Sequence, residues 1–270
     1  MRKTVLITGA SRGIGRAIAV AFAKADYNLV ITCSRSESEL LSLKDELETV
    51  YSVDVLASIG DISDYEYVVR LFAHGKERFH GVDVLINNAG ISYIGLIEDM
   101  TIEEWNRIVG VNLTSVFSTS KLAIPYMLSK KAGKIINISS VWSNVGASCE
   151  VAYSACKGGI NSFTRGLAKE LAPSNIQVNA IACGCIDPQM NRCFLKKNVP
   201  PLPMRSHPDD LVHRKKWLPL LYLSLKEMNT LPDRSSHWME SGSDRILLLK
   251  QRSSSFLSKG CFSVFTILHV

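Results

Sequence analysis

Short apolar runs alternate with amphipathic segments through the first two-thirds of the chain. The runs are rich in Val, Ile and Leu, as in TVLIT near the amino terminus, and such runs are typical of strands buried on both faces of a parallel sheet. The segments between them repeat apolar residues at helical spacing. The pattern predicts strands at 4–8, 28–33, 52–60, 82–87, 133–139 and 176–182, and helices at 14–25, 37–49, 65–78, 102–109, 113–130 and 152–171.

Strands that alternate with helices predict an α/β fold, with one doubly wound parallel sheet of the Rossmann-like type. The chain has 270 residues, of which 46% are hydrophobic, so it is long enough for one large domain with a substantial core. In such sheets, ligands bind at the carboxyl ends of the strands. Residues that directly follow the strands are therefore the candidates for a binding site.

A glycine-rich turn, TGASRGIG, joins the first predicted strand to the first predicted helix. Glycine permits positive φ and close approach of the backbone, and the amino terminus of the helix offers free N–H groups to an anion. A phosphate-bearing cofactor fits this turn, although tight βα turns also use glycine for structural reasons alone. The residues predicted to contact the cofactor here are Gly9, Ser11, Arg12, Gly13, Ile14 and Gly15.

The end of the second predicted strand indicates which dinucleotide fits. An acidic residue at this position would bind the adenosine ribose 2′-hydroxyl of NAD, and the segment TCSR contains none. Arg35, together with Arg12, is placed to pair with a 2′-phosphate. The sequence therefore favours NADP(H) over NAD(H); the alternative is that Arg35 is a solvated surface arginine.

Polar motifs also follow the later strands: NNAG after the fourth, and SS and then YSACK after the fifth. Tyr153 and Lys157 lie four residues apart, so they share one face of a helix. A nearby ammonium favours the phenolate and lowers the pKa of a tyrosine, which makes it a better acid–base group at neutral pH. We expect this pair, a serine at the end of the fifth strand and the glycine-rich turn to converge on one crevice.

TGASRGIG, NNAG, VNL, INISS and YSACK, in this order and spacing, resemble the short-chain dehydrogenase/reductase family from about residue 3 to residue 192. Within the family, these motif sequences are most similar to those of the 3-oxoacyl-[acyl-carrier-protein] reductases of bacterial fatty-acid biosynthesis. The resemblance implies an NADPH-dependent enzyme that reduces a ketone to a secondary alcohol. Its substrate would be a small molecule or a ketone bound to acyl carrier protein, and the enzyme would be a homotetramer or homodimer.

The resemblance also implies roles for individual residues. Tyr153 would protonate the carbonyl oxygen, Lys157 would lower the tyrosine pKa and hold the nicotinamide ribose, and Ser140 would bind the substrate carbonyl. Asn112 would distort its helix and hold a proton-relay water, whereas its position alone favours a simple N-cap before Leu113. The cofactor contacts that the resemblance adds are Asp61, Ile62, Asn88, Ala89 and Gly90, together with Tyr153 and Lys157.

The family pattern stops near residue 192. Cys183 and Pro188 stand where the family has a proline and a threonine, and the usual last strand is not recognisable. A shifted reading frame would explain the loss. If each new codon takes the third base of one codon and the first two bases of the next, suitable synonymous codons from Phe194 onward permit GTPEEVA, YITGQIITLDGEWI and a stop. These strings resemble the missing terminus. We interpret 1–192 as an NAD(P)-binding domain and 193–270 as an aberrant, frameshift-derived and poorly ordered tail, which leaves the sixth strand as an unpaired edge.

Charge and cysteine content argue against several other functions. Residues 1–192 carry 19 basic and 19 acidic side chains, so the net charge of +6 comes from the 12 basic and 6 acidic residues of the tail, whose scatter does not suit nucleic-acid binding. Seven cysteines without a CxxC pair or zinc-type histidine spacing predict reduced thiols in a cytoplasmic protein without a metal site. No run reaches the length of a membrane span. The open alternatives are an inactive frameshifted remnant and a family member that acts on a sugar, a steroid or another alcohol.

Overall fold

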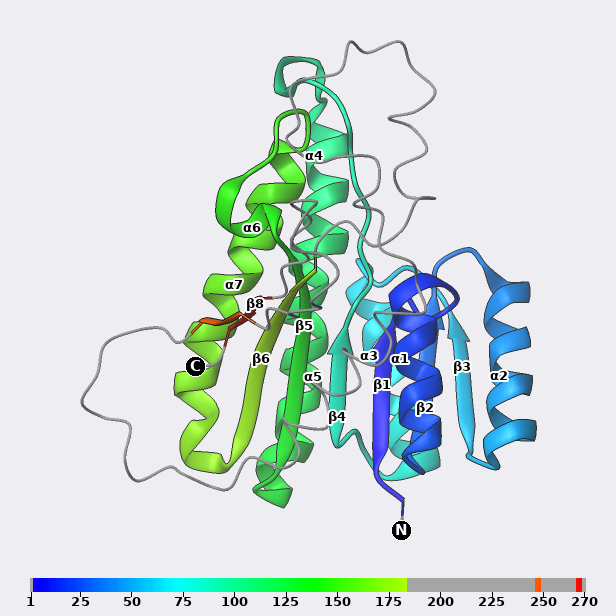
Figure 1. Ribbon diagram of the computed structural model, residues 1–270. Coiled ribbons are helices and arrows are strands. Elements are labelled where there is room, and N and C mark those ends of the chain that lie inside the picture. The colour runs from blue at the N-terminus through cyan, green and yellow to red at the C-terminus, as the bar shows by residue number, and fades with distance from the viewer. Residues whose placement is uncertain (1, 184–245, 249–265, 269–270) are drawn as a thin grey trace, which may run out of the picture.

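The computed structural model describes residues 2–183, 246–248 and 266–268. Figure 1 shows a sheet with helices packed on its faces. Its strands are β1 (Thr4–Thr8), β2 (Asn28–Cys33), β3 (Val55–Ile59), β4 (Val84–Asn87), β5 (Gly133–Ser140), β6 (Ile176–Cys183), β7 (Ile246–Leu248) and β8 (Thr266–Leu268). The strand order is β3-β2-β1-β4-β5-β6-β8-β7, and β1 to β6 are parallel. The predicted doubly wound α/β fold is confirmed.

The helices lie close to their predicted ranges. They are α1 (Gly13–Lys24), α2 (Glu37–Tyr51), α3 (Tyr65–Phe79), α4 (Ile102–Val109), α5 (Ser115–Lys130), the short α6 (Trp142–Val145) and α7 (Val151–Leu171), with 3₁₀ turns at Ile97–Asp99 and Ala172–Ser174. Local polar signals fix two of the starts. Asp64 caps α3 by accepting a hydrogen bond from the backbone N–H of Glu66, and Thr101 and Glu104 form a capping box at α4.

Hydrophobic cores cover both faces of the sheet. Ile31 belongs to the core under α1 and α2, with Ile18 and Leu43. Its neighbour Val30 belongs to the core under α3, α5 and α7, which includes Met127. Successive residues of a strand point to opposite faces, so each buried strand serves both cores. The strand ends are therefore left to form binding sites.

The predicted unpaired edge at β6 is wrong over part of its length. Ala180, Ile181 and Ala182 pair antiparallel with β8, and β8 pairs antiparallel with β7. A strand edge exposes backbone N–H and C=O groups that can pair with another segment, and here β8 occupies that place. Apart from β7 and β8, the interpretation of 193–270 as an aberrant tail falls outside the described residues.

No break separates α4 from α5. The segment Gly110–Thr114 is π-helical, so one continuous helix runs from Ile102 to Lys130. Asn112 lies fully buried inside this segment, which makes the N-cap interpretation wrong. The helix distortion implied by the family resemblance is present, and π-helical segments of this kind are frequent at functional sites.

Candidate active site

The glycine-rich turn after β1 packs against the NNAG turn after β4. The side-chain amide of Asn88 donates to the carbonyl oxygens of Thr8 (2.8 Å) and Gly9 (3.0 Å). The Thr8 hydroxyl accepts from the backbone N–H groups of Asn88 and Ala89 at 3.0 and 2.9 Å. A Cβ on Gly15 would lie 2.3 Å from the Gly9 oxygen, so only glycine fits. The linking role of Thr8 was not evident in the sequence, because it requires β1 and β4 to be neighbours.

The backbone of the glycine-rich turn suits an anion. Gly9 and Gly13 adopt φ of 66° and 59°, which glycine tolerates without a side-chain clash. The first turn of α1 contains no acidic residue, and Arg12 before it makes no side-chain cap bond with any described residue. The N–H groups at the start of α1 therefore suit a dinucleotide phosphate. Of the other predicted contacts here, Ser11 is buried and Ile14 half-buried.

Ser140, Tyr153 and Lys157 meet at the carboxyl end of β5. Ser140 ends the strand, and its side chain lies close enough to the Tyr153 hydroxyl to act on the pKa of that group. Tyr153 and Lys157 lie one turn apart on α7, with Lys157 Nζ 5.5 Å from the centroid of the tyrosine ring. Lys157 is buried and donates to the Ile138 carbonyl oxygen at 2.7 Å. The structure thus brings the predicted acid and its two partners together.

Asn112 reaches the same site from the π-helical segment. Its side chain donates to the Ile91 carbonyl oxygen (2.9 Å) and accepts from the Ile91 N–H (3.1 Å). Gly90 lies between it and the lysine, since a Cβ there would be 2.7 Å from Asn112 Oδ1 and 3.7 Å from Lys157 Nζ. All four predicted catalytic residues and the NNAG turn therefore share one edge of the sheet.

Burial dominates the electrostatics of these groups. It raises the pKa of Tyr153 to about 12, although the hydrogen bond with Ser140 acts in the opposite direction. It lowers the pKa of Lys157 to about 8. The sequence-based expectation of a lowered tyrosine pKa is not met in this structure. Desolvation of the phenolate is the largest cause, and the Glu150 carboxylate raises the pKa further, whereas Lys157 is itself buried and bonded to the Ile138 carbonyl.

Two buried thiols that sequence reasoning left without a role flank Lys157. Cys183 ends β6, and its carbonyl oxygen accepts a hydrogen bond from the Val141 N–H at 3.0 Å, just beyond Ser140. Burial raises the pKa of Cys183 to about 12 and also raises the pKa of Cys156. Both are therefore neutral thiols at physiological pH, and they contribute to the low polarity around Lys157.

The ends of β2 and β3 lie side by side, because the Gly60 N–H donates to the Cys33 carbonyl oxygen at 2.9 Å. Arg35 is exposed in the loop after β2. Among the described residues, neither Arg35 nor Arg12 takes part in an ion pair. Their guanidinium groups are thus available to a phosphate at this edge of the sheet.

Asp61, predicted to contact the cofactor, is held by Ser63 and Arg107, two residues that sequence reasoning missed. Its carboxylate accepts from the backbone N–H and hydroxyl of Ser63 at 2.9 and 2.7 Å, and forms an ion pair with Arg107 of α4. Burial acts to raise the pKa of Asp61, but these hydrogen bonds and the guanidinium hold it below its usual value. The neighbouring Ile62 is buried in the core under α3.

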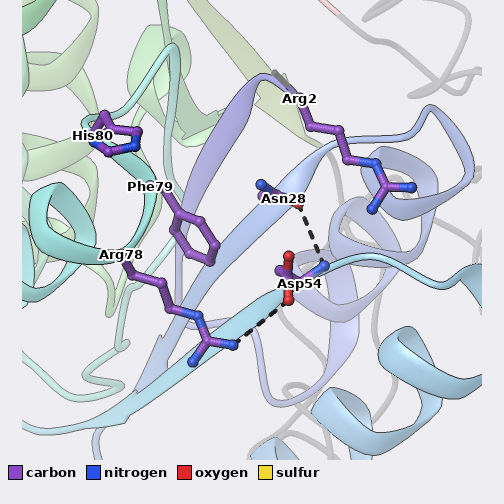
Figure 2. Close-up of a pocket in the computed structure, with 6 residues that line it drawn as sticks. All are labelled: Arg2, Asn28, Asp54, Arg78, Phe79 and His80. Atoms are coloured by element: carbon purple, nitrogen blue, oxygen red, sulfur yellow. Dashed lines mark hydrogen bonds and ion pairs between the residues drawn. The ribbon is translucent and has the colours of Figure 1, made fainter.

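An open hollow of about 170 Å³ lies at the opposite edge of the sheet (Figure 2). Its lining residues are Arg2, Asn28, Asp54, Arg78, Phe79 and His80. Arg78 pairs with Asp54 at 3.7 Å, and Arg2 pairs with Asp26 at 2.8 Å. The hollow lies at the amino ends of β1, β2 and β3, away from the predicted site, and its two arginines are already paired.

Within the described ranges, no three His, Cys, Asp or Glu side chains are grouped so as to hold a metal ion. The cysteines described, Cys33, Cys149, Cys156 and Cys183, are free thiols. No helix in the same part of the chain combines the length and the apolar character needed to cross a bilayer.

The fold and the site define a nucleotide-dependent oxidoreductase. The family model described as short chain dehydrogenase matches residues 3–198. The chain belongs to the short chain dehydrogenase family, and it is an NAD(P)-dependent dehydrogenase or reductase.

Two relatives illustrate the range of activities in the family. The chain is 40% identical to the D-beta-hydroxybutyrate dehydrogenase of Rhizobium meliloti (strain 1021) over 186 residues, which is 69% of this chain and 72% of the relative. It is 38% identical to the 3-oxoacyl-[acyl-carrier-protein] reductase FabG of Staphylococcus aureus (strain N315), also over 186 residues, covering 69% and 75% of the two chains.

Two solved structures resemble the fold. An alcohol dehydrogenase from Thermococcus sibiricus, complexed with 5-hydroxy-NADP, superposes with a TM-score of 0.71 at 26% identity, covering 84% of this chain and 91% of the other. An NAD⁺-bound xylitol dehydrogenase superposes with a TM-score of 0.67 at 27% identity, covering 71% and 74%. The two similar structures thus carry dinucleotides of both kinds.

Proposed function

We propose that the chain reduces the ketone of a 3-oxoacyl thioester, carried by acyl carrier protein, to a secondary alcohol with NADPH. The observation that carries the proposal is the meeting of Ser140, Tyr153 and Lys157 beside the glycine-rich turn. The substrate class is supported by the two relatives, whose names both describe an oxygen at the third carbon of an acyl chain. The preference for NADPH is supported by Arg35 after β2, which forms no ion pair with any residue that the structure describes, and by the absence of an acid at 34–36.

The residues present fit a bound dinucleotide and a carbonyl. The α1 amino terminus would hold the phosphates and Lys157 the nicotinamide ribose, and NADPH when bound supplies hydride to the carbonyl carbon. The Ser140 hydroxyl donates a hydrogen bond to the carbonyl oxygen and polarises it. Tyr153, protonated because burial raises its pKa to about 12, gives its proton to that oxygen as the carbon is reduced. The Lys157 ammonium then stabilises the phenolate that remains.

We further propose that the protein is a homo-oligomer of the cytoplasm. Two exposed apolar side chains on α5, Phe117 (50% exposed) and Leu128 (43%), support a contact with a second copy along this helix. The free thiols of the described cysteines suit a reducing compartment.

Turnover with a set of ketones tests the function. NADPH oxidation by the purified full chain is measured with acetoacetyl-coenzyme A, free acetoacetate and a keto-sugar acid, and each is repeated with NADH. We expect the thioester to give the highest kcat/KM, by about tenfold or more, and NADPH to be preferred. A higher kcat/KM with free acetoacetate or the keto-sugar would overturn the substrate class. A folded protein without turnover on any of them would support the inactive remnant.

The rate of reduction is expected to fall as pH rises through about 8. Lys157 is charged below its pKa of about 8 and loses that charge above it, whereas Tyr153, with a pKa of about 12, stays protonated. Loss of the ammonium removes the stabilisation of the phenolate, so kcat should decrease by up to about tenfold per pH unit. Lys134, at the amino end of β5, also has its pKa lowered to about 8 by burial. A Lys134→Gln variant should keep the same pH profile, and a flat wild-type profile would contradict the assignment.

A further inference from the structure

The buried side-chain amide of Asn161 on α7 bonds to residues on either side of Ser140. Ser139 and Ser140 are consecutive residues of β5 and point to opposite faces of the strand. The Ser140 side chain lies beside the Tyr153 hydroxyl, whereas Ser139 donates to Oδ1 of Asn161 at 2.7 Å. Asn161 lies one turn beyond Lys157 on α7 and is 2% exposed.

The same amide holds the segment that follows Ser140. Asn161 Nδ2 donates to the Ser143 hydroxyl oxygen at 2.7 Å and to Asn144 Oδ1 at 3.2 Å. Ser143 in turn donates to the carbonyl oxygen of Ser140 at 2.5 Å. Asn161 thus ties α7 to β5 at Ser139, before Ser140, and to α6 at Ser143 and Asn144, after it.

The segment from Ser139 to Asn144 determines how the Ser140 hydroxyl forms hydrogen bonds. Its oxygen accepts a hydrogen bond from the backbone N–H of Trp142 at 3.2 Å, which α6 keeps in place. With one acceptor position used by this N–H, the hydroxyl proton points away from it and remains free to donate. The Tyr153 hydroxyl lies at this edge and, in the proposed reaction, so does the substrate carbonyl.

We propose that Asn161 is a positioning residue for the carbonyl reduction, a role that rests on the proposed function. Its amide fixes the segment from Ser139 to Asn144. The Ser140 hydroxyl therefore stays a hydrogen-bond donor toward Tyr153 and the substrate. Asn161 does not touch the reacting atoms and acts through Ser140. Loss of the amide releases α6 from α7, and a small displacement of a catalytic group is enough to slow a reaction strongly.

Replacement of Asn161 by leucine tests this role, because leucine has a similar volume and makes none of the three bonds. The matched control is Thr164→Val. Thr164 lies on the same helix, is fully buried and bonds to Asn137 at 2.9 Å and to the Ile160 carbonyl oxygen, but makes no bond to α6. Both variants lose buried hydrogen bonds, so both are expected to lose stability. Only Asn161→Leu should lower kcat, by between about 10-fold and 10²-fold, with KM for NADPH unchanged.

A double-mutant cycle with Ser140→Ala separates positioning from a structural role. If Asn161 acts through Ser140, Asn161→Leu should lower kcat in the wild-type chain and have no further effect in the Ser140→Ala background. An equal fractional loss in both backgrounds would overturn the proposal. Ser143→Ala, which removes only the link to the Ser140 carbonyl, serves if Asn161→Leu does not fold, and should show the same non-additivity with Ser140→Ala.

Hydrogen exchange gives a readout that needs no turnover. Backbone amides at 141–147 should exchange faster in Asn161→Leu than in Thr164→Val, measured by mass spectrometry on the full chain. Equal exchange in the two variants would refute the proposal that Asn161 holds the segment from Ser139 to Asn144, whatever the activity. Absent turnover in the wild-type chain, together with faster exchange in Asn161→Leu alone, would refute the proposed function and leave the contact between α6 and α7 supported.

Discussion

Tyr153→Phe is expected to lower kcat for ketone reduction by about 10²- to 10⁴-fold, the range that a general acid contributes. The substitution removes the proton donor and keeps the ring, which packs 5.5 Å from Lys157 Nζ. The hydroxyl is proposed to give its proton to the substrate, and Lys157 is kept to hold the nicotinamide ribose, so KM for NADPH should change little. The measurement is steady-state NADPH oxidation, with cofactor affinity taken from a fluorescence titration.

The control for this substitution is Tyr27→Phe. Tyr27 is also partly buried, and burial likewise raises the pKa of its hydroxyl, but it lies just before β2 at the amino edge of the sheet. Removing its hydroxyl should leave kcat unchanged. A loss of less than about tenfold in Tyr153→Phe would exclude the phenol as the general acid, because even modest general acid catalysis contributes more than that. An equal loss in both variants would indicate a general effect of tyrosine removal on the fold.

Most of the sheet was predictable because its determinants are local. Buried strands such as β1 and β2 are continuous apolar runs, and the caps at Asp64 and Thr101 mark the helix starts in the sequence itself. The π-helical segment was not predictable in this way. Its central residue, Asn112, bonds to the backbone of Ile91, which is 21 positions away, and such a bond appears only when the chain is folded.

The site was predictable in its residues and less so in its electrostatics. The motifs placed Ser140, Tyr153 and Lys157 correctly at one edge, because parallel strands end on the same side of a sheet. The direction of the shift in the tyrosine pKa was not predicted correctly, because it depends on how deeply the phenol is buried. Asn161 was missed for a similar reason. A polar residue on the buried face of the helix at 152–171 was the available signal, but two of its three partners lie on a short helix that the sequence did not reveal.

Arg35→Asp is expected to reverse the cofactor preference. Arg35 follows β2 beside the β3 loop that carries Asp61, so the adenosine end of the dinucleotide is proposed to lie here. Loss of charge-assisted bonds to a 2′-phosphate costs about 1.5–3 kcal/mol, and the new carboxylate adds repulsion of the phosphate. It also gains a hydrogen bond to the ribose 2′-hydroxyl of NADH. The ratio of kcat/KM for NADPH over NADH should therefore fall by about 10²-fold or more, because each 1.4 kcal/mol is a factor of ten.

The charge-matched control is Arg78→Asp, in the hollow at the amino edge. Arg78 and its partner Asp54 are 44% and 64% exposed, so loss of their ion pair costs little. The variant changes the net charge by the same amount, and a long-range effect of charge would appear in both variants. If the ratio falls only in Arg35→Asp, the guanidinium after β2 reads the 2′-phosphate. If it falls in neither, Arg35 is a solvated surface residue, and cofactor preference in this chain is set by another residue of the β2 edge, with Arg12 at the start of α1 as the next to replace.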